Sequence, residues 1–304
     1  MKRTLKFLVF SLFLATHFLA SAASRDDLWR QVNDAVQKGL PKTAITNLDP
    51  IIAGALKDKA YPEATKAIAR KIVLEGNIQG NKPEEKIVRL EAEMARAPKE
   101  MAPVMETLLA HWYWQYFQQN SWRFMQRTAT GQAPGKDFTT WDLPRLFAEI
   151  DRHFRQALAA EKILKATPIS AWDDLIEKGT MPDSERPTLY DFLAREALEF
   201  YTSGEQAGAK PEDAFELSAD GPIFHPVAEF LSWVDRIAGA EGLKLVGDTN
   251  AAGARALVLY RDLLRFHQGD PAPRLAFAAA DLERLTWGWN AAFGEGKNAA
   301  YKAA

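Results

Sequence analysis

Two glutamates, Glu196 and Glu199, are the residues whose type and setting come closest to catalysis. Helical enzymes of the bacterial envelope that cleave peptidoglycan use one Glu as a general acid. These two residues lack the Glu-Ser pair and the aromatic-rich motif of such enzymes. Their spacing of three places both on one helix face, which is typical of a solvated surface. A peptidoglycan-acting enzyme is therefore the alternative and not the first interpretation.

Histidines and acidic pairs show no metal-binding spacing. Beyond the first two dozen residues the histidines are His111, His153, His225 and His267. None has a His or Cys partner at ligand spacing, and HExxH is absent, so we expect surface or interhelix positions. Asp26-Asp27 and Asp173-Asp174 stand near expected helix starts, which favours a role at the positive dipole end over calcium binding. We expect no catalytic residue, no cofactor and no metal.

An unusually aromatic segment runs from His111 to Thr128, HWYWQYFQQNSWRFMQRT. Three Trp, two Tyr and two Phe fall within eighteen residues. Large aromatics at helical spacing usually form core; an exposed aromatic groove for a peptide or glycan is the alternative. If partner contacts exist, the candidates are Trp114, Trp122, Arg123 and Trp141.

The N-terminus predicts export. Lys2, Arg3 and Lys6 precede an apolar run from Phe7 to Leu19, and Ala20-Ser21-Ala22 is a small-residue cleavage site. This pattern is typical of a secretory signal peptide. The run is too short to span a bilayer comfortably, so we expect cleavage after Ala22, no transmembrane segment after cleavage, and a periplasmic or envelope location.

Composition narrows the function classes. The 304 residues hold no Cys, so stability must come from a hydrophobic core rather than disulfides. The chain has 38 basic and 40 acidic residues, and removing Lys2, Arg3 and Lys6 leaves 35 against 40, a net charge of −5. Nucleic-acid binding requires a basic face, so no nucleic-acid partner is expected.

Helical periodicity dominates the remaining sequence. Asp142 and Thr188 are expected helix caps, and Pro50 is expected to kink or interrupt its helix. The tail after Phe293 looks frayed. The pattern predicts helices over residues 28–36, 42–57, 62–78, 84–96, 99–119, 142–165, 169–178, 188–202, 227–238, 251–267 and 272–293.

Successive hairpins of roughly 35 to 40 residues are typical of helical repeats. We therefore predict an all-α fold, a degenerate tetratricopeptide-like (TPR-like) helical-hairpin solenoid. The expected divisions are a signal peptide (1–22), an N-terminal hairpin array (23–202), a connecting loop (203–226) and a C-terminal helical segment (227–304).

Several segments resemble the N-terminal helical region of large bacterial α2-macroglobulin family proteins of the Bacteroidetes type. They are LWRQVNDAVQKGLPKTAI, HWYWQYFQQNSWRFMQRT, TWDLPRLFAEI, RPTLYDFLAREALEFY, FHPVAEFL and ALVLYRDLLRFH. Together they span nearly the whole mature chain. The resemblance implies an exported helical leader that precedes macroglobulin β-sandwich domains in a protease-trapping protein. Those downstream domains, an envelope protein or a protease are then the expected partners.

The same family carries a thioester motif, Cys-Gly-Glu-Gln, and this chain has Ser203-Gly204-Glu205-Gln206. A hydroxyl would give an ester that reacts poorly with amines, so the match is interpreted as chance. The first hypothesis is a non-catalytic docking or scaffold module, which is a fragment, the product of a truncated gene, or free-standing. Alternatives are a stand-alone protein-binding scaffold of the envelope and the peptidoglycan-acting enzyme.

Overall fold

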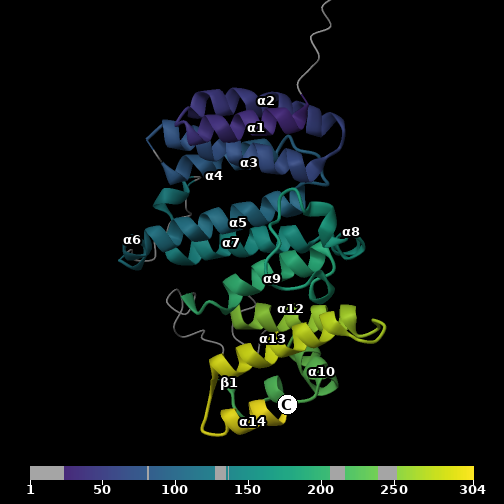
Figure 1. Ribbon diagram of the computed structural model, residues 1–304. Coiled ribbons are helices and arrows are strands. Elements are labelled where there is room, and N and C mark those ends of the chain that lie inside the picture. Colours follow the sequence, from purple (N-terminus) through teal and green to yellow (C-terminus); the bar gives the residue numbers. More distant parts are fainter. Residues whose placement is uncertain (1–23, 81, 127–134, 136, 206–215, 239–251) are drawn as a thin grey trace, which may run out of the picture.

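The computed structural model describes residues 24–80, 82–126, 135, 137–205, 216–238 and 252–304. The expected signal peptide, residues 1–22, lies outside them. The prediction of an all-α fold is confirmed, with helices stacked in successive layers from the N-terminal to the C-terminal end (Figure 1). None of the described helices combines the length and the apolar character that crossing a membrane requires.

The first layer consists of α1 (Arg25–Gln37), α2 (Pro41–Lys57) and α3 (Tyr61–Ile78). Helix α2 packs against both neighbours, and a small apolar cluster fills the space between them. Its members are Val32, Ala35, Ala44, Leu48, Ile51, Ala67 and Leu74. The expected interruption at Pro50 is wrong. Pro50 lies inside α2 on its exposed side. The helix therefore continues through Pro50, although proline has no backbone N–H to donate.

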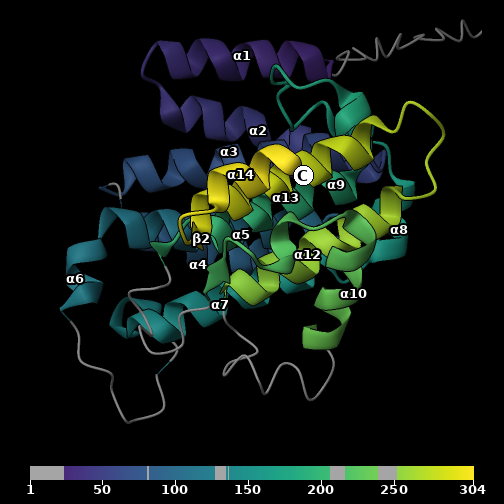
Figure 2. The same cartoon turned by 90° about the horizontal axis from the view of Figure 1, so that it is seen from below.

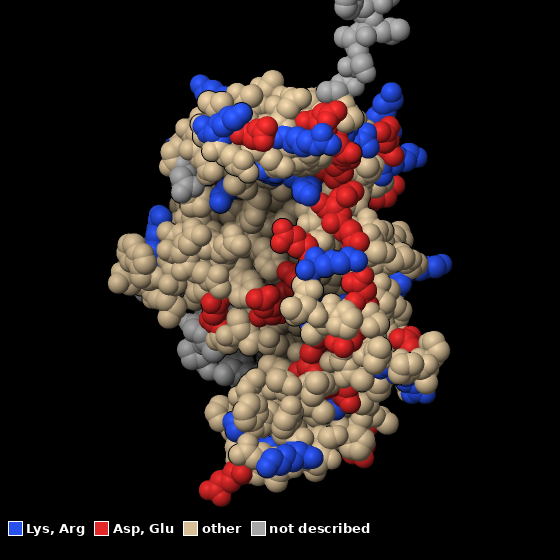
Figure 3. All heavy atoms as spheres, in the orientation of Figure 1, with Lys and Arg blue, Asp and Glu red and all other residues tan. Residues whose placement is uncertain are grey.

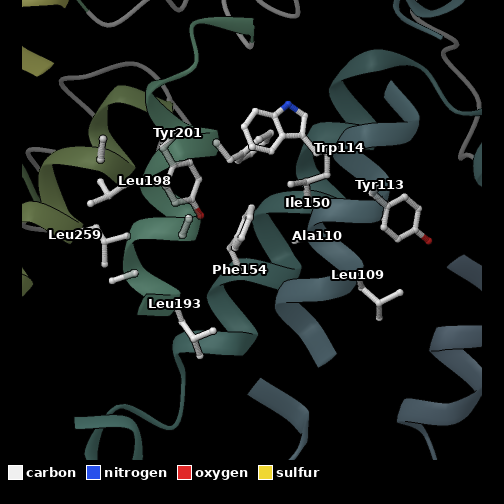
Figure 4. Close-up of a cluster of buried hydrophobic side chains, with 14 of the residues drawn as sticks. Leu109, Ala110, Tyr113, Trp114, Ile150, Phe154, Leu193, Leu198, Tyr201 and Leu259 are labelled. Carbon is white, nitrogen blue, oxygen red and sulfur yellow. The ribbon is translucent and has the colours of Figure 1, made fainter. Parts of the chain in front are cut away.

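The middle of the stack contains α4 (Pro83–Met94), α5 (Ala102–Gln119), α6 (Ser121–Met125), α7 (Leu143–Leu158) and α9 (Leu189–Thr202). Helix α5 packs along α7, and both contact α9. Figure 4 shows Phe154 between the α5 side and the α9 side of this core. Aromatic edges meet there, with Trp114 5.4 Å and Phe154 5.7 Å from the Phe200 ring centroid. The interpretation of the aromatic segment as core is confirmed for most of its described rings.

The expected caps are confirmed, and one expected helix is divided. Asp142 accepts from the Arg145 N–H at 3.0 Å, and Thr188 forms a capping box with Asp191. The helix predicted over 142–165 is two helices, α7 and α8 (Glu161–Ala166), separated at Ala159-Ala160. The short 3₁₀ helices η1 (Phe138–Thr140), η2 (Ile169–Trp172) and η3 (Asp183–Glu185) connect these elements. Residues 169–178 thus begin with a 3₁₀ turn, not a longer helix.

The last layer consists of α10 (Val227–Ala238), α12 (Ala252–His267), α13 (Leu275–Ala291) and α14 (Lys297–Ala303). Seen from below, α13 and α14 lie across the front of the stack (Figure 2). The tail expected to be frayed therefore contains a helix. Within the expected loop 203–226, residues 206–215 lie outside the described residues. Its described part holds β1 (Leu217–Ser218) and the 3₁₀ helix η6 (Pro222–Phe224), and β1 pairs in parallel with β2 (Ala292–Phe293).

Candidate functional site: a cleft between the first and third helices

A cleft opens between α1 and α3, the two helices that flank α2. Its volume is about 490 Å³, within the range of roughly 300–1,000 Å³ that is usual for small-ligand sites. Seven of its lining residues come from these helices: Arg25, Asp26, Trp29, Asn33, Glu63, Lys66 and Arg70.

Helical spacing explains why these side chains converge. On α1, Arg25, Trp29 and Asn33 recur every fourth position with Asp26 beside them, and on α3 the lining residues are three and four apart, so each set shares one helix face. The other face of α1 carries Val32 and Ala35, which are buried in the first-layer core. The apolar residues of α3 divide between α2, through Ala67 and Leu74, and the main core below, so a polar strip of α3 is left to line the cleft. Asp174, which follows η2, reaches its edge from the middle of the stack.

Glu63 organises one end of the cleft. Its Oε1 accepts the Trp29 indole N–H at 2.9 Å, and its Oε2 accepts the Arg25 Nε–H at 2.9 Å. Arg25 also donates to Asp58. The hydrogen bond to Asp58, reinforced by the charge of Glu63, raises the pKa of the Arg25 guanidinium above its ordinary value. The Glu63 side chain is only 14% exposed, and its hydrogen bond to the indole N–H fixes the Trp29 ring in the cleft.

Lys66 and Arg70 lie over the ring that Glu63 holds. The Lys66 Nζ is 5.3 Å and the Arg70 Cζ 5.8 Å from the Trp29 ring centroid, both within cation–π range. Within the described part of the chain, neither cation is paired with a carboxylate. Within the described residues these two positive charges therefore have an aromatic ring as their neighbour and no carboxylate in ion-pair contact.

The remaining charges of the cleft lie at its rim. Asp26 and Asp174 are exposed lining residues. Figure 3 shows charged side chains of both signs over the first layer, at the top of the molecule, and over the layers below it.

The candidate catalytic residues occupy a different place, between α5 and α9. Glu196 Oε2 lies 2.5 Å from His111 Nε2, close enough for an ion pair when the imidazole is protonated, although the contact does not have hydrogen-bond geometry. The two side chains are 27% and 21% exposed. Glu199 is exposed on the same helix. The structure therefore gives Glu196 an interhelix partner and leaves Glu199 solvated.

Glu205, the third residue of the Ser-Gly-Glu-Gln sequence, contacts the aromatic core. It accepts a hydrogen bond from the Trp114 indole N–H and one from Gln118 Nε2 at 3.2 Å. Ser203 donates to the Phe200 carbonyl at 2.9 Å, and Gln206 lies outside the described residues. Ser203 and Glu205 thus help to terminate α9, consistent with a chance resemblance to the thioester motif.

The four predicted contact residues are not brought together. Trp114 is 7% and Trp141 6% exposed, and the Trp141 indole N–H donates to the Gly135 carbonyl at 2.7 Å. Because both rings are buried, we remove Trp114 and Trp141 from the contact surface. Trp122 is 67% exposed, and Arg123 beside it on α6 is exposed as well, so only this pair is still available to a partner.

Buried histidines pair with carboxylates rather than with one another. His153 Nδ1 lies 2.5 Å from Glu106 Oε2, and Arg152 lies 3.0 Å from its Nε2. Burial alone raises the pKa of the neighbouring Glu149, but hydrogen bonds and charge from Arg152 outweigh burial and lower it. Among the described residues, no three His, Cys, Asp or Glu side chains are grouped so that they could hold a metal ion.

The acidic pairs differ in their positions. Asp26 and Asp27 lie in the first turn of α1, which confirms the expected role at a helix start. The same prediction for Asp173 and Asp174 is wrong, because these residues follow the end of η2. Lys178 instead contacts the Asp173 carboxylate at 3.3 Å.

Sequence reasoning missed the cleft. The signal that was available is the recurrence of Arg25, Trp29 and Asn33 every fourth residue, opposite the apolar stripe of the same helix. A lone Trp on the polar face of an otherwise amphipathic helix indicates either a contact or a positioning role for that ring.

Comparison of the chain with protein-family models, with curated proteins and with solved structures finds no match. The resemblance to the macroglobulin leader therefore stays a prediction from the quoted segments. The cleft between α1 and α3 is the feature from which a function can be argued.

Proposed function

We propose that this chain is a non-catalytic protein-binding module that holds a peptide segment of a partner in the cleft between α1 and α3. The observation that carries the proposal is the cleft itself, with its volume of about 490 Å³ and two cations without a counter-ion in the described residues. A groove between helices that joins a large aromatic ring to polar groups suits peptide recognition.

The finer setting belongs to the same proposal. We place the module in the periplasm or cell envelope, as the helical leader of a macroglobulin-like protease trap, where it docks the following domains or an envelope partner. The arrangement of α1, α2 and α3 supports a TPR-like solenoid, since α1 and α3 both pack on α2 and expose their polar faces to one groove. Such stacks commonly bind partners along their exposed helix faces.

The contact between Glu196 and His111 weighs against the peptidoglycan-acting alternative. A general acid requires a carboxyl that faces its substrate, whereas Glu196 is partly covered and meets a histidine from α5. Glu199 is exposed on the same helix and does not line the cleft between α1 and α3.

Display of random decapeptides against the full chain tests the binding function. Asn33→Trp fills the cleft, and Asn290→Trp is its matched control, because Asn290 is an exposed residue of α13 at the other end of the stack. We expect enriched peptides to bind the wild type and Asn290→Trp and to lose binding to Asn33→Trp. Equal binding to both variants would overturn the cleft as the site.

An assay of peptidoglycan cleavage tests the alternative in the same preparation. We expect no turnover by the wild type. Turnover that disappears in Glu196→Gln, with unchanged helical circular dichroism, would replace the binding proposal with the enzyme. The macroglobulin setting is tested separately in the DNA that adjoins the coding region. A neighbouring β-rich macroglobulin frame is the expected result, and its absence would leave only the stand-alone scaffold.

A further inference from the structure

We propose that the cleft selects an acidic peptide segment, whose carboxylates are bound by Lys66 and Arg70. This inference rests on the proposed binding function and names the chemistry of its ligand. The starting point is how the charges inside the cleft are paired. Three cations and three carboxylates line it. Arg25 and Glu63 form an ion pair at 2.9 Å, whereas within the described part of the chain neither Lys66 nor Arg70 forms an ion pair with a carboxylate.

The two cations are held ready for an anion. The Trp29 ring attracts both heads, at 5.3 and 5.8 Å, and Glu63 fixes that ring through its indole N–H. Charged side chains that are already positioned lose less conformational freedom when a ligand binds. The cation–π contacts leave the outer hydrogens of the Lys66 ammonium and of the Arg70 guanidinium available, so both can donate to carboxylate oxygens.

The helix register shows which end of the cleft would hold the carboxylates of the bound segment. Arg25 and Trp29 both contact Glu63 on α3, and Trp29 also contacts Lys66 and Arg70, one and two helical turns further along α3. Asn33, one more step along α1, therefore lies toward the Arg70 end of the cleft. The anion-binding end holds Lys66, Arg70 and the amide of Asn33. The opposite end holds Asp26, which suits the backbone N–H groups of the peptide.

The small number of cations in the cleft also disfavours larger polyanions as ligands. Without the expected signal peptide the chain has a net charge of −5, and Asp26 and Asp174 line the cleft together with its cations. A nucleic acid places a phosphate charge at every nucleotide and requires a broad basic face. Two cations bordered by carboxylates instead fit one or two localised negative charges. The cleft therefore favours a pair of acidic side chains on a peptide over a polyphosphate.

Binding of three defined decapeptides tests the inference on the full chain. Each has a central four-residue segment flanked by Gly and Ser, and the segments are Phe-Glu-Glu-Leu, Phe-Gln-Gln-Leu and Phe-Lys-Lys-Leu. Rhodamine-labelled peptides are titrated by fluorescence anisotropy at low and at moderate salt. We expect the Glu-Glu peptide to bind about tenfold more tightly than the Gln-Gln peptide, with a difference that shrinks as salt rises.

Variants assign the effect to the two cations. Lys66→Gln combined with Arg70→Gln should weaken binding of the Glu-Glu peptide about tenfold and leave the Gln-Gln peptide unchanged. The matched control combines Lys162→Gln with Arg236→Gln, two exposed cations on α8 and α10, and should bind like the wild type. Trp29→Phe keeps a ring but loses the bond to Glu63, and we expect a smaller loss. Circular dichroism confirms that each variant is folded.

The remaining outcomes separate this inference from the proposed function. Equal binding of all three peptides, abolished by Asn33→Trp, would overturn selection of acidic segments and leave the binding function standing. No binding of any peptide to the wild type, together with no enrichment from the random library, would overturn both. Displacement of the Glu-Glu peptide by inorganic phosphate or by a short oligothymidine at lower concentration than by free glutamate would also overturn the inference.

Discussion

His267 on α12 and Asp191 in the first turn of α9 form a buried pair that joins two helices 76 residues apart in sequence. His267 Nε2 lies 2.7 Å from Asp191 Oδ1, and the side chains are 2% and 0% exposed. The second ring nitrogen lies 2.7 Å from Asp270 Oδ2. Asp191 also accepts from the Thr188 backbone N–H at 3.1 Å, so one carboxylate both caps α9 and holds α12.

This pair predicts that stability depends on pH. Burial alone lowers the pKa of His267, but hydrogen bonds and charges from Asp191 and Asp270 outweigh burial and raise it above 6.5. The imidazolium therefore stabilises the fold fully below pH 6.5, and this contribution is lost as pH rises through the raised pKa. In urea titrations between pH 5.5 and 9 (chosen to bracket the ordinary pKa), the difference in free energy of unfolding between the wild type and His267→Gln should shrink as pH rises. Parallel curves would contradict the pairing.

For Asp191, the acidic partner, the contribution to stability changes with pH in the opposite direction. Burial raises the pKa of Asp191, but the hydrogen bond and charge of His267, with Thr188 and Arg195, outweigh it and lower the pKa below 3.8. The stabilisation is present above pH 3.8 and is lost as pH falls through the lowered pKa. Asp191→Asn should cost about 3 kcal/mol at pH 7, measured by urea unfolding. Asp270→Asn is the control and should cost less, because the Asp270 side chain is 35% exposed.

Arg284 provides a second prediction for the last layer. Its guanidinium is almost fully buried, donates to the carbonyls of Ile223 and His225, and lies 4.6 Å from the Phe230 ring centroid. Burial lowers its pKa, partly offset by Asp281. Arg284→Lys should lose about 3 kcal/mol of stability, since an ammonium cannot reach both carbonyls and Asp281 together. Arg236→Lys on the exposed face of α10 should change it by less than about 0.5 kcal/mol. Equal unfolding midpoints for the two variants would disprove the role of Arg284.

Local chemistry allowed much of the fold to be predicted. Caps at Asp142 and Thr188 specify helix starts through a few backbone N–H groups, and both are where the sequence places them. The break at Ala159-Ala160 was missed because alanine favours helix. The interruption expected at Pro50 was wrong for a related reason. Whether a missing backbone N–H matters depends on which side of α2 faces solvent, and the local sequence does not show this.

The candidate site was harder to predict, because it depends on a distance between helices. Nothing in the spacing of Lys66 and Arg70 reveals that α3 lies one helix away from α1, with α2 holding the two apart. The burial of Trp114 and Trp141 likewise depends on tertiary neighbours: Phe200 packs edge-on against Trp114, and Tyr113 stacks on Trp141. Composition identified the aromatic segment as core but could not sort its buried rings from the exposed Trp122.

Gly288 on α13 predicts a test of close packing. A Cβ at this position would lie 2.6 Å from Ile223 Cγ1. The approach of η6 to α13 is therefore closer than a residue with a Cβ at position 288 would permit. Gly288→Ala should destabilise the protein by about 1–3 kcal/mol, although alanine favours helix by about 1 kcal/mol. Adding Ile223→Ala, which removes the clashing atom, should make the effect of Gly288→Ala smaller in a double-mutant cycle of urea unfolding.

Gly54→Ala is the matched control for that cycle. Its added methyl would meet the Arg25 side chain at 3.4 Å, an ordinary contact with a movable group. We expect an unchanged or higher free energy of unfolding, because the helix propensity of alanine is then not opposed. A Gly288→Ala variant as stable as Gly54→Ala would show that η6 can move away from α13.

The tryptophans of the aromatic segment provide the last prediction, which separates core from surface. Trp114 is 7% exposed, packs edge-on against Phe200 and donates to Glu205, whereas Trp122 is 67% exposed. Trp114→Ala should cost about 3–5 kcal/mol, because it empties the space between α5 and α9, and Trp122→Ala should stay within about 0.5 kcal/mol of the wild type. Urea unfolding followed by circular dichroism measures both. If the two substitutions cost the same, the segment does not form the core between α5 and α9, and an exposed aromatic groove becomes the better interpretation.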